Sequence, residues 1–225
     1  MHHEARRPIA GEAPHPALIL LHGRGADERD LLPLAHQLDP RLFVVSARAP
    51  FRFGWGGYVW YDLAPQGVGY PDPATLDSSM RKVRAFLGEV TETYPLDRSR
   101  IYLGGFSNGA TLAGVLALTD PDLVAGAAVL SGYLPVHSDL PYRPDAAAGH
   151  PFFEGHGVAD QVIPIMWARA GKQLLDATPV VLTYREYRMG HQIDGEELGD
   201  LGVWFSAVLD HGAPGAGIPL ETRSP

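Results

Sequence analysis

Short apolar runs alternate along the chain with longer segments in which apolar residues recur every three or four positions. The short runs are rich in Val, Ile, Leu and Phe and predict strands at residues 17–21, 43–47, 101–104, 126–130, 152–155 and 180–187. The periodic segments predict helices at residues 27–38, 75–94, 108–118, 164–177 and 197–211, with Pro164 suited to a first helical turn. This alternation indicates an α/β fold, with a mostly parallel sheet and helices on both of its faces.

Length and composition set the domain organisation. A chain of 225 residues with 45% hydrophobic content fits one compact domain, which we assign to residues 17–211. Residues 1–16 form a flexible N-terminal segment in this interpretation. The last segment, residues 212–225, is rich in glycine and proline and predicts a disordered tail.

Charge and cysteine usage exclude several functional classes. The net charge of −8 argues against a nucleic-acid partner, because such proteins usually carry a basic patch. The chain has no cysteine, so it has no disulfide, thiolate metal site or cysteine nucleophile. No apolar run approaches the roughly 18 residues of a membrane span, and the start lacks the apolar core of a signal peptide. We expect a cytoplasmic protein without stable membrane insertion.

A single serine stands between glycines in LGGFSNGA, residues 103–110. The residues before it predict a strand and those after it a helix, which places Ser107 in a tight strand-to-helix corner. Glycines two positions before and after permit the bend and expose Oγ. The helix N-terminus beside the corner favours developing negative charge. The stretch therefore predicts a nucleophile.

A serine nucleophile needs a base and an orienting acid, and both are expected in loops at the carboxyl ends of later strands. Asp160 follows one predicted strand and His191 follows the next, in an order typical of α/β-hydrolases. His156 is a rival base and Asp194 a rival acid. However, His156 precedes Asp160 by four residues in one loop, and Asp194 falls where it could cap the last helix.

Acyl transfer also needs donors for the oxyanion. One is expected to be the backbone N–H of Asn108, the residue after the nucleophile, and the second the backbone N–H of Arg24 in the turn HGRG. We interpret His2 and His3 as part of a solvated chain end rather than as a metal site. No HExxH pattern, phosphate loop or dinucleotide fingerprint occurs, so we expect no cofactor and no metal.

Seven motifs together resemble the phospholipase/carboxylesterase family of α/β-hydrolases, which includes acyl-protein thioesterases and small bacterial carboxylesterases. They are LLHGRGADERDLLPLA, RAPF, VWYDL, GFSNGA, LSGYLP, HGVADQVIP and GHQI, in family order, and the similarity spans almost all of residues 17–211. The resemblance implies a triad of Ser107, Asp160 and His191, an oxyanion hole of the Arg24 and Asn108 amides, and compatibility with a homodimer. The chain departs from the usual GFSQGG at Asn108 and Ala110, which bears on the shape of the pocket.

The expected function is a carboxylesterase that cleaves short- to medium-chain esters through an acyl-serine intermediate. The alternatives are an acyl-protein thioesterase or lysophospholipase on the same triad, and a non-catalytic binding module. The connection of residues 134–150 is too short for a helical lid, which predicts an open site without a cap domain. The predicted substrate contacts are residues of the aromatic run 51–63 and apolar residues near the catalytic loops: Trp55, Tyr58, Trp60, Leu134, Val162 and Ile193.

Overall fold

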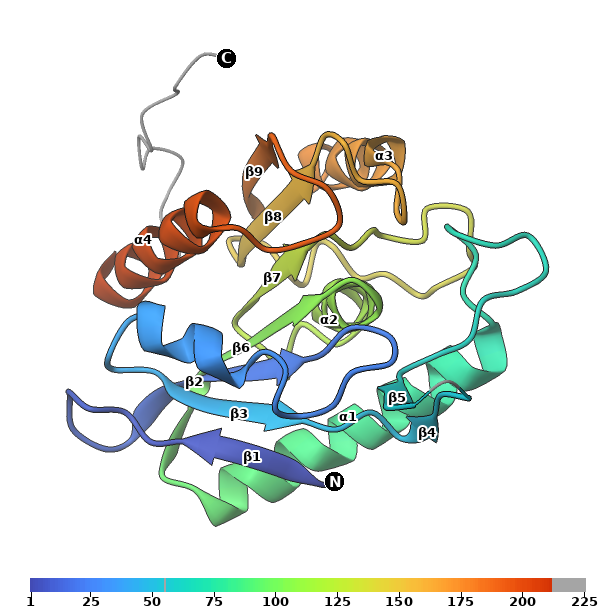
Figure 1. The fold of residues 1–225 in the computed structure, drawn as a ribbon. Coiled ribbons are helices and arrows are strands. Elements are labelled where there is room, and N and C mark those ends of the chain that lie inside the picture. The colour runs from blue at the N-terminus through green and yellow to red at the C-terminus, as the bar shows by residue number, and fades with distance from the viewer. Residues whose placement is uncertain (55, 212–225) are drawn as a thin grey trace.

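A seven-stranded sheet forms the centre of the computed structural model, which describes residues 1–54 and 56–211 (Figure 1). Its strand order is β1-β3-β2-β6-β7-β8-β9, and every neighbouring pair is parallel except β1 with β3. The strands are β1 (His3–Arg6), β2 (His15–Leu21), β3 (Phe43–Ala47), β6 (Leu96–Phe106), β7 (Gly126–Leu130), β8 (Pro151–Gly157) and β9 (Val181–Tyr187).

The register brings the carboxyl ends of the central strands to one edge of the sheet. Leu21 of β2 pairs with Gly105 of β6, Phe106 pairs with Leu130 of β7, and Leu130 pairs with Gly155 of β8. Side chains in the loops that follow these strands therefore meet at the same edge, where open α/β sheets bind their ligands.

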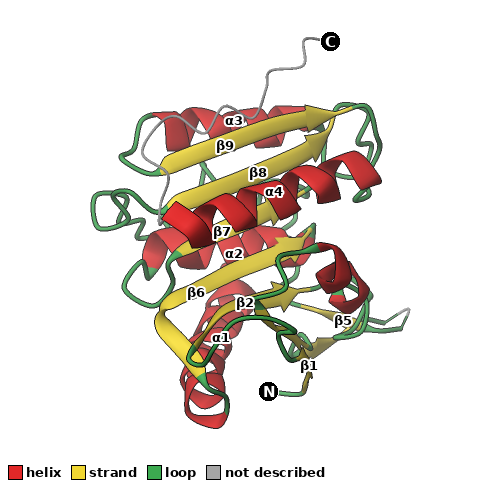
Figure 2. Cartoon of the chain, turned by 90° about the vertical axis from the view of Figure 1, so that its left-hand side faces the viewer, coloured by secondary structure: helices red, strands yellow, loops and turns green. Residues whose placement is uncertain are grey.

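Helices cover both faces of the sheet (Figure 2). Three lie on one face, namely α1 (Pro73–Thr93), α2 (Asn108–Thr119) and α3 (Ile165–Asp176), while α4 (Gly195–His211) and the short 3₁₀ helix η1 (Leu32–Gln37) lie on the other. The predicted α/β architecture is confirmed.

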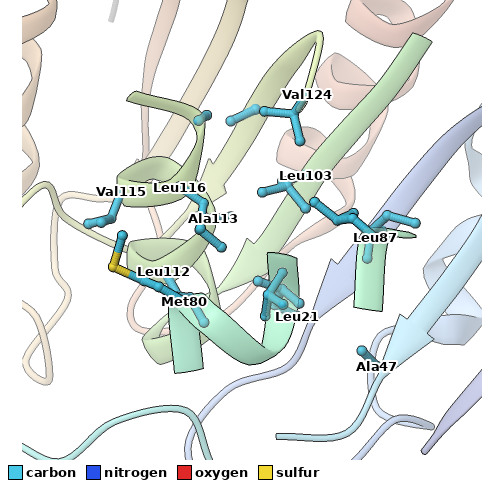
Figure 3. Packing of buried hydrophobic residues seen from close by; sticks show 14 of the residues in the cluster. Leu21, Ala47, Met80, Leu87, Leu103, Leu112, Ala113, Val115, Leu116 and Val124 are labelled. Carbon is cyan, nitrogen blue, oxygen red and sulfur yellow. The ribbon is translucent and has the colours of Figure 1, made fainter. Parts of the chain in front are cut away.

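Two apolar clusters, one on each face of the sheet, result from the alternation of side chains between the two faces along buried strands. Ala17, Ile19 and Leu21 of β2 face α1 and α2, whereas Leu18 and Leu20 face η1 and α4. Figure 3 shows the first cluster, with Leu21 and Leu103 of the sheet near Met80 and Leu87 of α1 and Leu112 of α2. Helix α2 is buried along its whole length, which explains its uniformly small and apolar sequence.

One predicted helix is largely absent. Only Leu32–Gln37 of the predicted 27–38 segment is helical, as a 3₁₀ turn with proline in its first turn. Asp27 accepts the backbone N–H of Arg29, and the buried Glu28 carboxylate binds Arg48. These contacts hold residues 27–31 in a turn, so the helical period there marks buried positions rather than a helix.

The N-terminal segment also differs from the prediction. Residues 3–6 form β1 and pair with β3, so the segment predicted to be flexible completes one edge of the sheet. A small antiparallel hairpin of β4 (Phe51–Arg52) and β5 (Tyr58–Val59) was likewise not predicted. The predicted disordered tail, residues 212–225, lies outside the described residues.

The connection between β7 and β8 has no helix or strand at residues 134–150, in keeping with the predicted absence of a cap domain. Within residues 1–54 and 56–211, no helix has both the length and the apolar character needed to cross a membrane. The cytoplasmic location stays a prediction.

Candidate active site

Ser107 occupies a strained corner between β6 and α2. Its backbone has φ 55° and ψ −116°, a region that residues with a side chain rarely adopt. A Cβ at Gly105 would come within 2.7 Å of the Leu21 carbonyl oxygen, and a Cβ at Gly109 would overlap that oxygen outright. The two glycines are therefore required because β2 passes close beneath the corner.

The three side chains predicted to act together form one hydrogen-bonded chain. His191 Nε2 lies 2.8 Å from Ser107 Oγ, and His191 Nδ1 lies 2.7 Å from Asp160 Oδ2. The other oxygen of Asp160 accepts the backbone N–H groups of Val162 and Ile163, each at 2.8 Å. The Asp160 side chain is fully buried, so these donors fix its orientation without competition from water.

The two rival residues, His156 and Asp194, make other contacts in the structure. His156 Nε2 lies 2.7 Å from the Ile163 carbonyl oxygen and 3.4 Å from Asp160 Oδ2, behind the acid rather than beside the serine. Burial lowers the pKa of His156. Asp194 accepts the backbone N–H groups of Glu196 and Glu197 and so caps α4.

The predicted oxyanion donors come from the start of α2 and from the turn after β2. Within the described residues, neither the Asn108 nor the Arg24 backbone N–H has a protein acceptor. Both residues line the same cavity as Ser107 and His191. This arrangement leaves two N–H groups available to an oxyanion.

His22 orients the peptide group of the second predicted donor, a contact that sequence analysis did not identify. Burial lowers the pKa of His22 and keeps the ring neutral. Its Nε2 accepts the N–H of Ala49 at 3.0 Å, so Nδ1 carries the proton and donates to the Gly23 carbonyl at 2.7 Å. Because C=O and N–H point in opposite directions across a trans peptide, this bond turns the Arg24 N–H away from His22. The contact with Ala49 is tertiary, and no local pattern signals it.

A cavity of about 310 Å³ opens at Ser107. Val162, a predicted substrate contact, lines this cavity and is 55% exposed at its rim. Leu63 is a second exposed residue at the rim. The lining also includes two tyrosines that sequence analysis missed, Tyr61 and Tyr133, whose hydroxyl oxygens lie 3.5 Å apart. Burial raises the pKa of both phenols, so they stay neutral.

Four other predicted substrate contacts lie away from the cavity wall. Trp60 is fully buried and donates its indole N–H to the His22 carbonyl, and Leu134 is buried in the core beneath Gly114. Tyr58 pairs in β5 and its hydroxyl accepts from Arg48, while Ile193 packs against the cluster under α4. The prediction is corrected for Trp60 and Leu134, whose side chains are turned inward to the core, whereas Tyr58 and Ile193 are half-buried and stay predictions. Trp55 lies outside the described residues.

One cluster of the described residues has the donor set of a metal site. Ligand atoms of His2, Glu4 and Glu28 lie within 4.8 Å of one another. Both oxygens of Glu28 are bound by the Arg48 guanidinium, at 2.5 and 2.6 Å, and this ion pair lowers the pKa of Glu28 to about 2. The guanidinium already neutralises the carboxylate that a cation would need.

Comparison with known proteins matches this sequence and this fold to one family. The sequence model described as phospholipase/carboxylesterase matches residues 8–208. The putative hydrolase MhqD of Bacillus subtilis is 32% identical over 85% of this chain and 93% of its own length. Acyl-protein thioesterase 1 of Candida albicans is 27% identical over 91% of this chain and 97% of its own. The crystal structure of the Bacillus cereus carboxylesterase superposes with a TM-score of 0.81 at 26% identity, over 91% and 93% of the two chains.

Proposed function

The chain belongs to the phospholipase/carboxylesterase family, and from this premise we propose that it hydrolyses carboxylic esters with Ser107 as nucleophile, His191 as general base and Asp160 as orienting acid. The observation that carries the proposal is the hydrogen-bonded chain from Ser107 Oγ through both nitrogens of His191 to Asp160, at 2.8 and 2.7 Å, beside a cavity. A base in contact with a hydroxyl, and itself held by a buried carboxylate, is the arrangement that activates serine.

Acylation begins when Ser107 Oγ attacks the ester carbonyl carbon. His191 Nε2 takes the hydroxyl proton as the new C–O bond forms, and the carbonyl oxygen becomes an oxyanion. Asp160 holds the imidazole in the tautomer with the proton on Nδ1 and stabilises the imidazolium. His191 then gives its proton to the leaving alcohol oxygen as that C–O bond breaks, which leaves an acyl-serine.

Deacylation repeats these steps with water. His191 takes a proton from water, the hydroxide oxygen attacks the acyl carbon, and the proton returns to Ser107 Oγ as the acid departs. The backbone N–H groups of Arg24 and Asn108 are the proposed oxyanion donors in both halves. Asn108 begins α2, so the positive end of the helix dipole reinforces its N–H.

The cavity supports short- to medium-chain esters as substrates. Its volume of about 310 Å³ and its lining of Tyr61, Tyr133 and Val68 fit a small apolar acyl or alcohol group. Leu63 and Val162 are exposed at its rim. The same serine chemistry cleaves thioesters, and the likeness to a protein named acyl-protein thioesterase 1 supports that alternative.

The test is hydrolysis of p-nitrophenyl acetate, butyrate, octanoate and palmitate by the wild type and by Ser107→Ala. We expect activity with an optimum at butyrate or octanoate, and loss of at least about a thousandfold in the variant. A fluorophosphonate should add once to the wild type and not to Ser107→Ala, as read by mass spectrometry. Equal activity in both proteins would refute the assignment of Ser107.

Matched oxygen and sulfur esters of one acyl group separate the two activities. A ratio of kcat/KM values that favours the oxygen ester supports the carboxylesterase. A strong preference for the thioester would assign the chain to the alternative.

A further inference from the structure

The two proposed oxyanion donors belong to separate elements, and both lie beyond Leu21 and Gly105, the last residues that pair β2 with β6. Asn108 begins α2. Arg24 lies in residues 22–26, called the oxyanion loop, and β2 ends before this loop at Leu21. A hole binds an oxyanion only when both N–H groups lie about 2.7–3.1 Å from the same point, so their relative position matters for the rate.

Trp60 and Tyr61, called the bridging segment, contact the side chains of both donor residues. Asn108 Oδ1 accepts the Trp60 N–H at 2.8 Å, and Asn108 Nδ2 donates to the Tyr61 carbonyl at 3.2 Å. Arg24 Nη2 donates to the same carbonyl at 2.9 Å. One carbonyl thus receives a hydrogen bond from each of the two donor residues.

Further bonds join the oxyanion loop to the chain just before and within the bridging segment. Gly25 N–H donates to the Tyr58 carbonyl and Tyr58 N–H donates to the Ala26 carbonyl, both at 2.8 Å. The Trp60 indole N–H donates to the His22 carbonyl at 2.9 Å. A Cβ at Gly57 would overlap the Gly25 carbonyl, so the two backbones are in close contact there. These contacts therefore tie the oxyanion loop to the bridging segment.

The Asn108 side chain is the link between the bridging segment and the serine corner. Asn108, Trp60 and Tyr61 are each at most 6% exposed, so water does not compete for their hydrogen bonds. The Asn108 amide uses its oxygen on the Trp60 N–H and its nitrogen on the Tyr61 carbonyl, at the two ends of the bridging segment, which fixes both the distance and the orientation of this segment. Its backbone N–H takes no part in these bonds.

We propose that the side chains of Asn108 and Arg24 are positioning residues, which set the spacing of the oxyanion hole through the bridging segment. The proposal rests on the proposed function and assigns these two residues a second role beside their backbone N–H groups. Both N–H groups remain after any substitution other than proline, so a side-chain variant keeps both donors while it removes the positioning bonds. A displacement of about 1 Å at a reacting centre costs on the order of a hundredfold in rate.

The experiment compares Asn108→Ala and Arg24→Met with a control, Ser79→Ala. The Ser79 hydroxyl, on α1, donates a hydrogen bond to the Trp60 carbonyl. Ser79→Ala therefore removes one hydrogen bond of the bridging segment and leaves the side chains of both donor residues unchanged. Each protein is assayed for kcat and KM on p-nitrophenyl butyrate and for inhibition by a trifluoromethyl ketone. The Ser107 Oγ adds to the ketone carbonyl and produces an oxyanion that needs the hole. Thermal unfolding checks that each variant is folded.

We expect Asn108→Ala and Arg24→Met to lose roughly ten- to a hundredfold in kcat, with KM within about threefold of wild type. The inhibition constant of the ketone should rise by the same factor as kcat falls. The double variant should lose less than the product of the single losses, because both side chains act on the Tyr61 carbonyl. Ser79→Ala should keep kcat within about threefold, even where its melting temperature falls.

Two results would overturn the proposal. One is a folded Arg24→Met or Asn108→Ala protein with wild-type kcat and ketone affinity, and the other is an equal loss of kcat in Ser79→Ala. Failure of the proposed function gives a separate result, because the wild type itself would then neither hydrolyse esters nor bind the ketone.

Discussion

Ser107 carries a backbone conformation that its own side chain disfavours. At φ 55° and ψ −116°, Cβ crowds the neighbouring peptide groups, at a typical cost of about 1–3 kcal/mol. The surroundings hold it there: the Ser107 N–H donates to the Leu130 carbonyl of β7, and its carbonyl accepts from Thr111 in α2. The strain presents Oγ to His191 rather than to the core.

Replacing Ser107 by glycine should separate this strain from the chemistry. Ser107→Ala and Ser107→Gly both lack the hydroxyl, but only glycine adopts the observed φ without Cβ strain. We expect Ser107→Gly to melt at a higher temperature than Ser107→Ala, by an amount equivalent to about 1 kcal/mol. Thermal unfolding of the two inactive proteins measures the difference. A lower melting temperature for the glycine variant would contradict the strain.

Asp160→Asn should abolish turnover while leaving substrate binding in place. Asp160 Oδ1 accepts two backbone N–H groups, so an asparagine keeps its oxygen on that side and turns its NH₂ toward His191. His191 Nδ1 must then accept, which puts the proton on Nε2 and leaves no base for Ser107. We expect kcat to fall about ten-thousand-fold with a similar KM. Steady-state kinetics check this, and a loss confined to KM would contradict it.

The proposed triad could be assembled from sequence because each member follows a recognisable strand. Ser107, Asp160 and His191 come after parallel strands whose carboxyl ends meet at one edge of the sheet. Side-chain direction inside an irregular loop is not periodic, so Trp60 was predicted at the cavity, whereas its neighbour Tyr61 lines it.

At the scale of elements, strand positions were easier to predict than the segments between strands. Strands β3 and β7 begin and end where the apolar runs do, because both faces of these strands are buried. Strand β1 has no apolar run, since it joins the sheet at an edge through backbone pairing with β3 and through polar side chains such as His3, which contacts Tyr94. The predicted helix at residues 27–38 is largely absent because the buried Glu28 forms an ion pair with Arg48. These two residues are 20 positions apart, so no local pattern signals the contact.

Helical glycines test how closely each helix packs. A Cβ at Gly88 in α1 meets no atom within 4 Å, whereas a Cβ at Gly109 in α2 would overlap the Leu21 carbonyl. We expect Gly88→Ala to stabilise the protein by about 0.5–1 kcal/mol, since alanine loses less entropy in a helix. Gly109→Ala should destabilise it by more than about 3 kcal/mol and suppress activity. Urea unfolding measures both, and a tolerated Gly109→Ala would mean that α2 can shift away from β2.

For the molecule as a whole, an unpaired carboxyl group lies on each face of strand β8, one from the strand itself and one from α4. The Glu154 side chain lies under α3 near Gly171, and Glu197 of α4 presses its carboxyl group against Gly155. Neither carboxyl group has a hydrogen-bond partner among residues 1–54 and 56–211. Burial raises the pKa of each to about 8, so both groups are largely protonated at neutral pH.

The raised pKa values predict that stability falls between pH 7 and pH 9. In the unfolded chain both carboxyls are ionised above roughly pH 5, so folding binds protons and the stabilisation is lost as pH rises through about 8. Each group contributes a loss of about 1.4 kcal/mol over this window. Four other groups with shifted pKa values add little to this loss. The pKa values of Glu28 and Asp39 are lowered to about 2, so both carboxyls are ionised throughout this window. The pKa values of the buried His22 and His156 are lowered from 6.5, so both rings are neutral there.

Glutamine variants test whether the carboxyl groups of Glu154 and Glu197 cause this loss of stability. Glu154→Gln and Glu197→Gln cannot ionise, so each should lose about half as much unfolding free energy as the wild type between pH 7 and pH 9, and the double variant almost none. Urea unfolding at the two pH values measures the difference, and Glu196→Gln, an exposed neighbour on α4, is the matched control. A single variant with the full wild-type loss would show that its carboxyl group is already ionised at pH 7. That result would require a cation or an ordered water beside the carboxylate, on the face of β8 where the replaced group lies.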